Sequence, residues 1–284
     1  MDAPSNRGFN TTSANREIKD GMFRLLFDTQ ENAAELYYAL TGIKCRPNEV
    51  QIITIMTVIS GKLKNDLAFI VRGKMMVVGE HMSSHAEPTH PLLMYVGALY
   101  EKWIKMKGEE KLLYGSKQYK IPTPEFVVFY NGTAARPEKE VLYLSSAFEL
   151  PGDKELGSLE LEVPVYNINK GMNKELFDRS PKLKQNAEFI AKVRELNKLY
   201  NDYVRVVQEA TNYCIANGIL ADFLKEQGGK VVSILTAEYN LETHMRVYGE
   251  ELLENRNIEL AKEMLVMVSL LIKLLSGLSF QRKP

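Results

Sequence analysis

Two carboxylates stand at the ends of two neighbouring apolar segments. In KNDLAFIVRGKMMVVGEHMSS, residues 64–84, Asp66 precedes the run LAFIV and Glu80 follows shortly after the run MMVV. Both runs are apolar at every position, which is typical of strands whose sheet is covered on both faces. Carboxylate oxygens at the ends of paired strands form the kind of site that a hard divalent cation such as Mg²⁺ prefers. The segment therefore predicts a metal site built from Asp66 and Glu80.

The length of the loop between the two runs decides whether the two acids can meet. Its Arg-Gly connection predicts a hairpin, and with a two-residue loop Asp66 and Glu80 belong to opposite faces of the sheet. With a three-residue loop at residues 71–73, Asp66 lies opposite Val78, on the same face as Glu80. A three-residue loop needs a left-handed glycine at its last position, and Gly73 stands there. We therefore expect the three-residue loop.

A group of histidines follows the second run. His81, His85 and His90 lie within ten residues of Glu80 and would suit zinc, but no HExxH motif is present, and Pro88 favours a loop. A histidine beside a metal can also act as a base. The chain has no glycine-rich phosphate loop and no G-x-S-x-G motif, which argues against nucleotide hydrolysis and acyl transfer.

The segments around the hairpin alternate between helical and strand patterns. Apolar residues recur at helical spacing from Asp20 and over residues 32–40, where Gly42 ends the pattern. We expect further elements as follows: strands at residues 50–59, 67–71, 74–80, 125–130 and 159–166, and a helix at residues 91–106. The expected fold class is α/β, with a mixed sheet flanked by helices. The expected domains are a disordered tail at residues 1–15, a core at 16–180 and a helical C-terminal region at 181–284.

Composition describes an ordinary globular protein. The chain has 284 residues, 36 basic and 36 acidic side chains, 45% hydrophobic residues and 25% charged residues. These values exclude a disordered chain and a coiled coil over the whole length. The balanced charge argues against non-specific coating of nucleic acid or membrane, although it is compatible with a local basic patch.

The cysteines and the apolar segments bear on location. Cys45 and Cys214 are far apart and fit no zinc-finger spacing, so we expect reduced thiols in a cytoplasmic protein, and the polar N-terminus predicts no signal peptide. The most apolar stretch, residues 264–275, is interrupted by Ser269 and Lys273 and is shorter than the ~20 residues of a membrane-spanning helix. We expect no membrane contact, and a helix that packs on the body of the protein or on a second copy in a homodimer.

The same segments resemble the recombination-promoting nuclease (Rpn, YhgA-like transposase) family, a branch of the PD-(D/E)XK nuclease superfamily. The strings KNDLAFIV and VVGEHMSS of the hairpin carry the resemblance, followed by PLLMYVGALYEKWI at residues 91–104. Further matches are FRLLF, LYYALTG, PTPEFVVFYNG, LSSAF, VYNIN, CIANGILADFL and LTAEYN. Their order and spacing extend the resemblance over residues 18–245.

The resemblance implies a PD-(D/E)XK nuclease-like fold and an endonuclease that cleaves DNA with Mg²⁺ or Mn²⁺. Asp66 and Glu80 would be the catalytic acids and would ligate the metal together with the backbone carbonyl of His81. A metal held in this way activates the phosphate and supplies a hydroxide at neutral pH. Glu35, on the first helix, is the candidate for an additional ligand.

The chain departs from the family pattern at the position of the catalytic helper. The family has a glutamine there, and other superfamily members have a water-activating lysine, whereas this chain has Met82, which cannot orient or polarise a water. A family arginine also falls loosely at Leu93. The candidates for a substitute helper are Lys64, Lys74, His81 and His85. We expect an endonuclease, and the alternative is a weakened or inactive pseudo-nuclease that binds DNA or protein.

Overall fold

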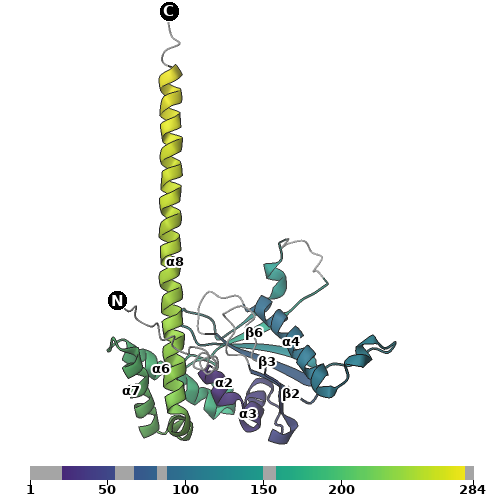
Figure 1. The fold of residues 1–284 in the computed structure, drawn as a ribbon. Helices are drawn as coiled ribbons and strands as arrows, with labels where there is room; N and C mark the ends of the chain where they lie inside the picture. The colour runs from purple at the N-terminus through teal and green to yellow at the C-terminus, as the bar shows by residue number, and fades with distance from the viewer. Residues whose placement is uncertain (1–20, 55–66, 82–87, 150–157, 279–284) are drawn as a thin grey trace, which may run out of the picture. The chain divides into compact units, whose positions relative to one another are not determined.

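The computed structural model describes residues 21–54, 67–81, 88–149 and 158–278 (Figure 1). In chain order its elements are α2 (Met22–Phe27), α3 (Gln30–Thr41), η1 (Pro47–Glu49), β1 (Gln51–Ile52), β2 (Leu67–Val71), β3 (Lys74–His81), α4 (Thr89–Lys107), η2 (Glu110–Tyr114), β4 (Thr123–Tyr130), β5 (Lys139–Tyr143), η3 (Leu144–Ala147), β6 (Glu162–Asn167), α5 (Lys174–Arg179), α6 (Pro181–Asn197), α7 (Tyr203–Ala216) and α8 (Ala221–Leu278).

The strands form one mixed sheet in the order β1-β2-β3-β4-β6-β5. Strands β1, β2 and β3 are antiparallel neighbours, β3, β4 and β6 run parallel, and β5 is antiparallel to β6. Helix α4 connects the parallel strands β3 and β4, as parallel pairs require a crossover. The expected α/β class with a mixed sheet is confirmed.

Helices cover both faces of this sheet, and each face has its own hydrophobic core. On one face α2, α3, α6 and α7 pack against alternate strand residues such as Phe69 and Val78. On the other face α4 packs against Met75 and Val77. This alternation explains why the two runs of the hairpin are apolar at every position: each residue is buried on one side or the other, except Ile70, which is partly buried.

The hairpin between β2 and β3 has a two-residue loop, so the expected three-residue loop is wrong. Val71 pairs directly with Lys74. The two loop residues, Arg72 and Gly73, have φ angles of 49° and 76°. Positive φ at both central residues is the mark of a type I′ turn, whose twist matches that of the strands it joins.

Arg72 tolerates the left-handed conformation because its side chain is held from two sides. Its Nε lies 3.3 Å from Glu49 Oε1, and its Nη2 donates to the carbonyl of Lys44 at 3.1 Å. Both partners belong to the segment that leads into β1. These contacts, made with residues that lie 23 and 28 positions earlier in the chain, favour the two-residue loop over the three-residue loop.

Most other expected elements are present. Strand β2 has the expected bounds, α4 begins two residues earlier than expected, and Gly42 ends α3 with a φ of 72°. Of the strand expected at residues 50–59 the structure describes Gln51–Ile52, and residues 55–59 lie outside the described ranges. Strand β5 was not expected. The disordered tail expected at residues 1–15 also lies outside the described ranges.

The helices after Ser180 begin in the body of the protein. Leu183 of α6, Val206 of α7 and Leu224 of α8 belong to the core on the face of α2 and α3. The chain forms two compact units that divide after Leu235. Helix α8 runs through this division, and its later residues belong to the second unit. Nowhere in the described ranges is a helix both long enough and apolar enough to cross a membrane.

Candidate functional site

The predicted metal ligands include the last two residues of β3. The backbones of Glu80 and His81 pair with Phe129 and Tyr130 of β4. On the other side of β4, Asn167 of β6 pairs with Tyr130. Because β3, β4 and β6 are parallel, their carboxyl ends meet at one edge of the sheet. This is the edge at which open α/β sheets bind ligands.

Several predicted site residues lie outside the described ranges: Lys64, Asp66, Met82 and His85. The structure therefore places Glu80 and His81 at the end of β3 and leaves the remainder of the predicted metal site undescribed. Within the described ranges, no group of three or more histidine, cysteine, aspartate and glutamate side chains is arranged to hold a metal ion. The predicted ligand set stays a prediction.

The hairpin register bears on the predicted pairing of the two acids. The described ladder ends where Leu67 pairs with Val78. If this ladder continued unchanged by one residue, position 66 would lie opposite Gly79. Neighbouring positions of a strand belong to opposite faces of the sheet, so position 80 would be on the other face from position 66. With a two-residue loop, the regular ladder does not put Asp66 and Glu80 on one face. A shared metal now requires the chain to leave the regular ladder before Asp66.

Lys74 is too far along β3 to help a metal at Glu80. It is the first residue of the strand, and Glu80 follows six residues later, which is about 20 Å at the usual strand rise. Its Nζ lies 2.6 Å from Glu125 Oε1, and this contact raises the pKa of Lys74. Lys74 therefore belongs to an exposed ion pair at the opposite end of the strand.

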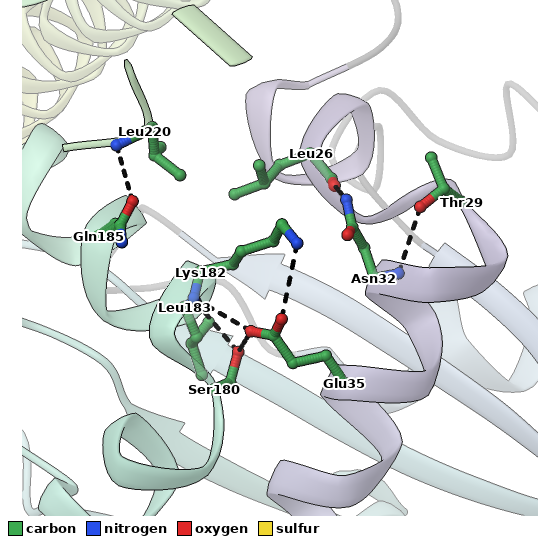
Figure 2. A network of polar contacts seen from close by, with 9 residues as sticks. All are labelled: Leu26, Thr29, Asn32, Glu35, Ser180, Lys182, Leu183, Gln185 and Leu220. Carbon is green, nitrogen blue, oxygen red and sulfur yellow. Dashed lines mark hydrogen bonds and ion pairs between the residues drawn. The ribbon is translucent and has the colours of Figure 1, made fainter. Parts of the chain in front are cut away.

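Glu35 occupies a described position, and its carboxylate contacts the start of α6 (Figure 2). Its Oε1 accepts hydrogen bonds from Ser180 Oγ at 2.6 Å and from the backbone N–H of Lys182 at 3.0 Å. Its Oε2 lies 3.6 Å from Lys182 Nζ. Ser180 is the N-cap of α6, and its Oγ also accepts from the N–H of Leu183 at 3.1 Å.

These contacts give Glu35 a structural role. The first N–H groups of a helix have no partner within the helix, and Glu35 satisfies one of them while its charge favours the positive helix end. Its carboxylate is part of a network that joins α3 to α6, two helices far apart in sequence. The additional metal ligand considered for this residue is not needed to explain why an acid stands here.

A cluster of polar side chains that the sequence analysis did not single out lies at the carboxyl edge of the sheet. We call Asn131, Asn167, Asn169 and Arg194 the asparagine cluster. Asn169 Nδ2 donates to the carbonyl of Gly132 at 3.0 Å and to Asn167 Oδ1 at 2.9 Å. Arg194 of α6 donates to Asn169 Oδ1 at 2.7 Å, to Asn131 Oδ1 at 3.3 Å and to the Asn131 carbonyl.

The arginine determines how the Asn131 amide is oriented. A guanidinium group only donates, so the oxygen of the amide faces Arg194 and the nitrogen points away from it. Asn131 is 1% exposed, and its Nδ2 finds no acceptor among the residues that the structure describes. A buried donor without a partner costs about 1–3 kcal/mol. Such a group is a candidate for contact with a bound water or a ligand oxygen.

The sequence holds part of the signal for this cluster. Asn131 and Asn169 follow two buried strands, in the strings FYNG and VYNIN, so polar residues at the strand ends could have been grouped as one edge. Arg194 carries no such signal, because α6 contains several charged residues and periodicity does not say which one points at the sheet.

Comparison with known proteins does not assign the chain to a family: no family model, no curated protein and no solved structure matches it.

Proposed function

We propose that this protein is a Mg²⁺- or Mn²⁺-dependent DNA endonuclease of the recombination-promoting nuclease type. The observation that carries the proposal is the position of Glu80. It is the residue before the last in β3, at the carboxyl edge of a mixed sheet, and the neighbouring antiparallel strand is the one that follows Asp66 in sequence. The sheet with helices on both faces is of the kind that the family resemblance implies.

In this proposal Asp66, Glu80 and the carbonyl of His81 hold the metal ion. Carboxylate and carbonyl oxygens are the ligands that Mg²⁺ prefers, and the bound ion activates both the phosphate and the attacking water. In this proposal DNA is the substrate, and the protein acts in the cytoplasm, where the free thiols of Cys45 and Cys214 stay reduced.

The asparagine cluster supports phosphate binding at the carboxyl edge of the sheet. Asn131 follows β4 two residues after Phe129, the register partner of Glu80. Two residues span about 7 Å along a strand. A guanidinium and a buried amide donor therefore lie at the same edge of the sheet as the proposed ligand. Donors of this kind bind phosphate oxygens.

Plasmid nicking tests the proposal. Purified protein is incubated with supercoiled plasmid in EDTA, Mg²⁺ or Mn²⁺, alongside Asp66→Ala and Glu80→Ala. Glu162→Ala is the matched control, because this exposed acid begins β6 at the opposite end of the sheet from the carboxyl edge. We expect metal-dependent nicking by the wild type and by Glu162→Ala, and none by the other two variants.

Metal binding is measured separately through thermal unfolding. An ion that binds only the folded protein raises the melting temperature, and removal of a ligand should abolish this rise. Equal metal-induced shifts in the wild type and in both site variants would place the ions elsewhere. DNA binding without cleavage in any metal would favour the pseudo-nuclease.

We also propose that a second copy of the chain is a partner. In the second unit, the exposed residues Leu253, Leu260, Met264 and Met267 recur at the spacing of a coiled-coil seam. Light scattering after size exclusion should give a dimer for the wild type. Leu260→Glu combined with Met264→Glu should give a monomer, because two charges would be buried in the seam. A monomeric wild type would refute this part of the proposal.

A further inference from the structure

Residues 105–121, which we call the basic arm, join the end of α4 to the start of β4. The chain as a whole has no net charge, yet this segment contains five lysines against two glutamates and no arginine or aspartate, a net charge of +3. Every residue from 110 to 118 is exposed. The arm is therefore a local basic surface on a neutral protein.

The arm also exposes large apolar side chains at its short helix η2. Leu112 and Leu113 are each about half exposed, and Tyr114 is 91% exposed. Single exposed apolar residues are common, but three consecutive ones beside lysines make a contiguous patch. Lys111 precedes this patch, and Lys117 and Lys120 follow it.

The base of the arm is held in place by aromatic and polar contacts. The hydroxyl of Tyr119 donates to Glu109 Oε2 at 2.5 Å, and this contact raises the pKa of Tyr119 to about 12. The ring of Tyr119 lies 6.0 Å from that of Trp103, and Lys107 Nζ lies 5.9 Å from the Trp103 ring centre. The apolar tip is thus presented by an ordered segment, which lowers the entropy lost on binding.

We propose that the basic arm binds duplex DNA, with its lysines on the phosphates and with Leu112, Leu113 or Tyr114 wedged against a base step. Lysines bind the backbone by releasing counterions, and apolar wedges that insert between base steps are a known mode of DNA contact. The positive charge favours nucleic acid over a neutral protein partner. This inference rests on the proposed function, because it takes DNA as the substrate.

The distance to the proposed metal site is compatible with one duplex. The arm ends two residues before Thr123, the first residue of β4, and Phe129, the partner of Glu80, lies six residues after Thr123 on that strand. At the usual strand rise this is about 20 Å. One turn of B-DNA measures about 34 Å, so a duplex cut at Glu80 reaches the arm within a turn.

Fluorescence anisotropy with a 30-bp duplex in EDTA tests the arm independently of cleavage. Lys117→Gln combined with Lys120→Gln should reduce the slope of log affinity against log salt by about two. The control is Lys198→Gln combined with Lys230→Gln, two exposed lysines outside the arm, which should leave the slope unchanged. Equal slopes in both double variants would overturn the proposal.

The wedge is tested with 2-aminopurine in the duplex and with the fluorescence of Trp103, the single tryptophan of the chain. Wild-type protein should raise 2-aminopurine emission and change that of Trp103. Leu112→Ser, Leu113→Ser and Tyr114→Ser combined in one variant should remove both signals and weaken binding about tenfold. The control is Leu199→Ser combined with Tyr143→Ser, two exposed residues outside the arm.

The outcomes separate this inference from the proposed function. If every arm variant cleaves and binds DNA as the wild type does, the proposed nuclease function stands and DNA binding by the basic arm is refuted. If the arm variants weaken DNA binding but the wild type does not cleave DNA, the proposed nuclease function is refuted and DNA binding by the basic arm is supported. If the wild type sediments with phosphatidylserine vesicles and the arm variants do not, while all of them bind DNA equally, the arm binds a lipid surface and the proposal is overturned.

Discussion

The carboxylate of Glu35 accepts a hydrogen bond of 2.6 Å from the hydroxyl of Ser180, which caps α6. This contact ties the first long helix of the chain to the helix that delivers Arg194 to the carboxyl edge of the sheet. This polar contact on α3 therefore helps to hold the helix that carries Arg194, and an acid that resembles a metal ligand in sequence acts as a helix cap.

Replacing Glu35 should destabilise the protein. In Glu35→Ala the hydroxyl of Ser180 and the N–H of Lys182 lose their acceptor in a partly buried place, which costs about 1–3 kcal/mol in the free energy of unfolding. Urea unfolding measures this cost. Glu31→Ala, an exposed acid on the same helix, should cost less than about 1 kcal/mol. Unchanged stability with lost metal-dependent cleavage would instead make Glu35 a metal ligand.

The turn of the hairpin yields a prediction with an internal control. Gly73 has a φ of 76°, so Gly73→Ala forces a side chain into the left-handed region and should lower the free energy of unfolding by about 1–2 kcal/mol. Gly97→Ala should act in the opposite direction by up to ~1 kcal/mol. That glycine is exposed within α4, where an added Cβ meets nothing, and alanine is the better helix former. Denaturation of both variants in parallel measures the difference.

The sequence predicted the elements of the fold more reliably than their register. Continuous apolar runs identified β2, β3 and β4, because strands buried on both faces need such residues. The loop of the hairpin could not be chosen from Gly73 alone, since the outcome depended on Arg72, whose positive φ is supported by Glu49 and Lys44. Strand β5 was missed because it lies at the edge of the sheet and keeps polar residues.

The buried thiol of Cys214 predicts a pH dependence of stability. Burial raises the pKa of Cys214 to about 11, from an ordinary value of 9.0 in the unfolded chain. Between these values the unfolded chain releases a proton that the folded protein keeps, so the stability from this thiol is complete below pH 9 and is lost as the pH rises toward 11.

Urea unfolding of the wild type and of Cys214→Ala from pH 8.5 to 10.5 checks this dependence. The variant loses packing at every pH, but its stability should fall less steeply over the window. Tyr119, whose pKa is also raised, is present in both proteins and drops out of the difference. Parallel curves for the two proteins would show that the thiol does not contribute.

Part of the candidate site could be predicted from the sequence, and part could not. Glu80 was found from its place after a buried run, and the structure puts it at the carboxyl end of β3. The asparagine cluster was missed because its members come from three distant segments. The parallel order of β3, β4 and β6 and the packing of α6 bring Asn131, Asn169 and Arg194 together.

The last prediction concerns Met82, the residue at the helper position of the proposed nuclease. A thioether cannot orient or deprotonate a water, whereas a positioned lysine or glutamine can, and such a group is typically worth about 10²–10⁴-fold in rate. If the site is a weakened nuclease, Met82→Lys or Met82→Gln should raise the rate of plasmid nicking, and adding Asp66→Ala should remove the gain.

The matched control for Met82→Lys is Met94→Lys, which adds the same charge at an exposed position of α4 and should leave the rate unchanged. An efficient wild-type rate that the Met82 variants leave equal or lower would mean that another residue is the helper, and His81 and His85 would be replaced next. Failure of every variant to cleave, with DNA binding retained, would identify a pseudo-nuclease, because the metal ligands alone would then be insufficient even with the helper restored.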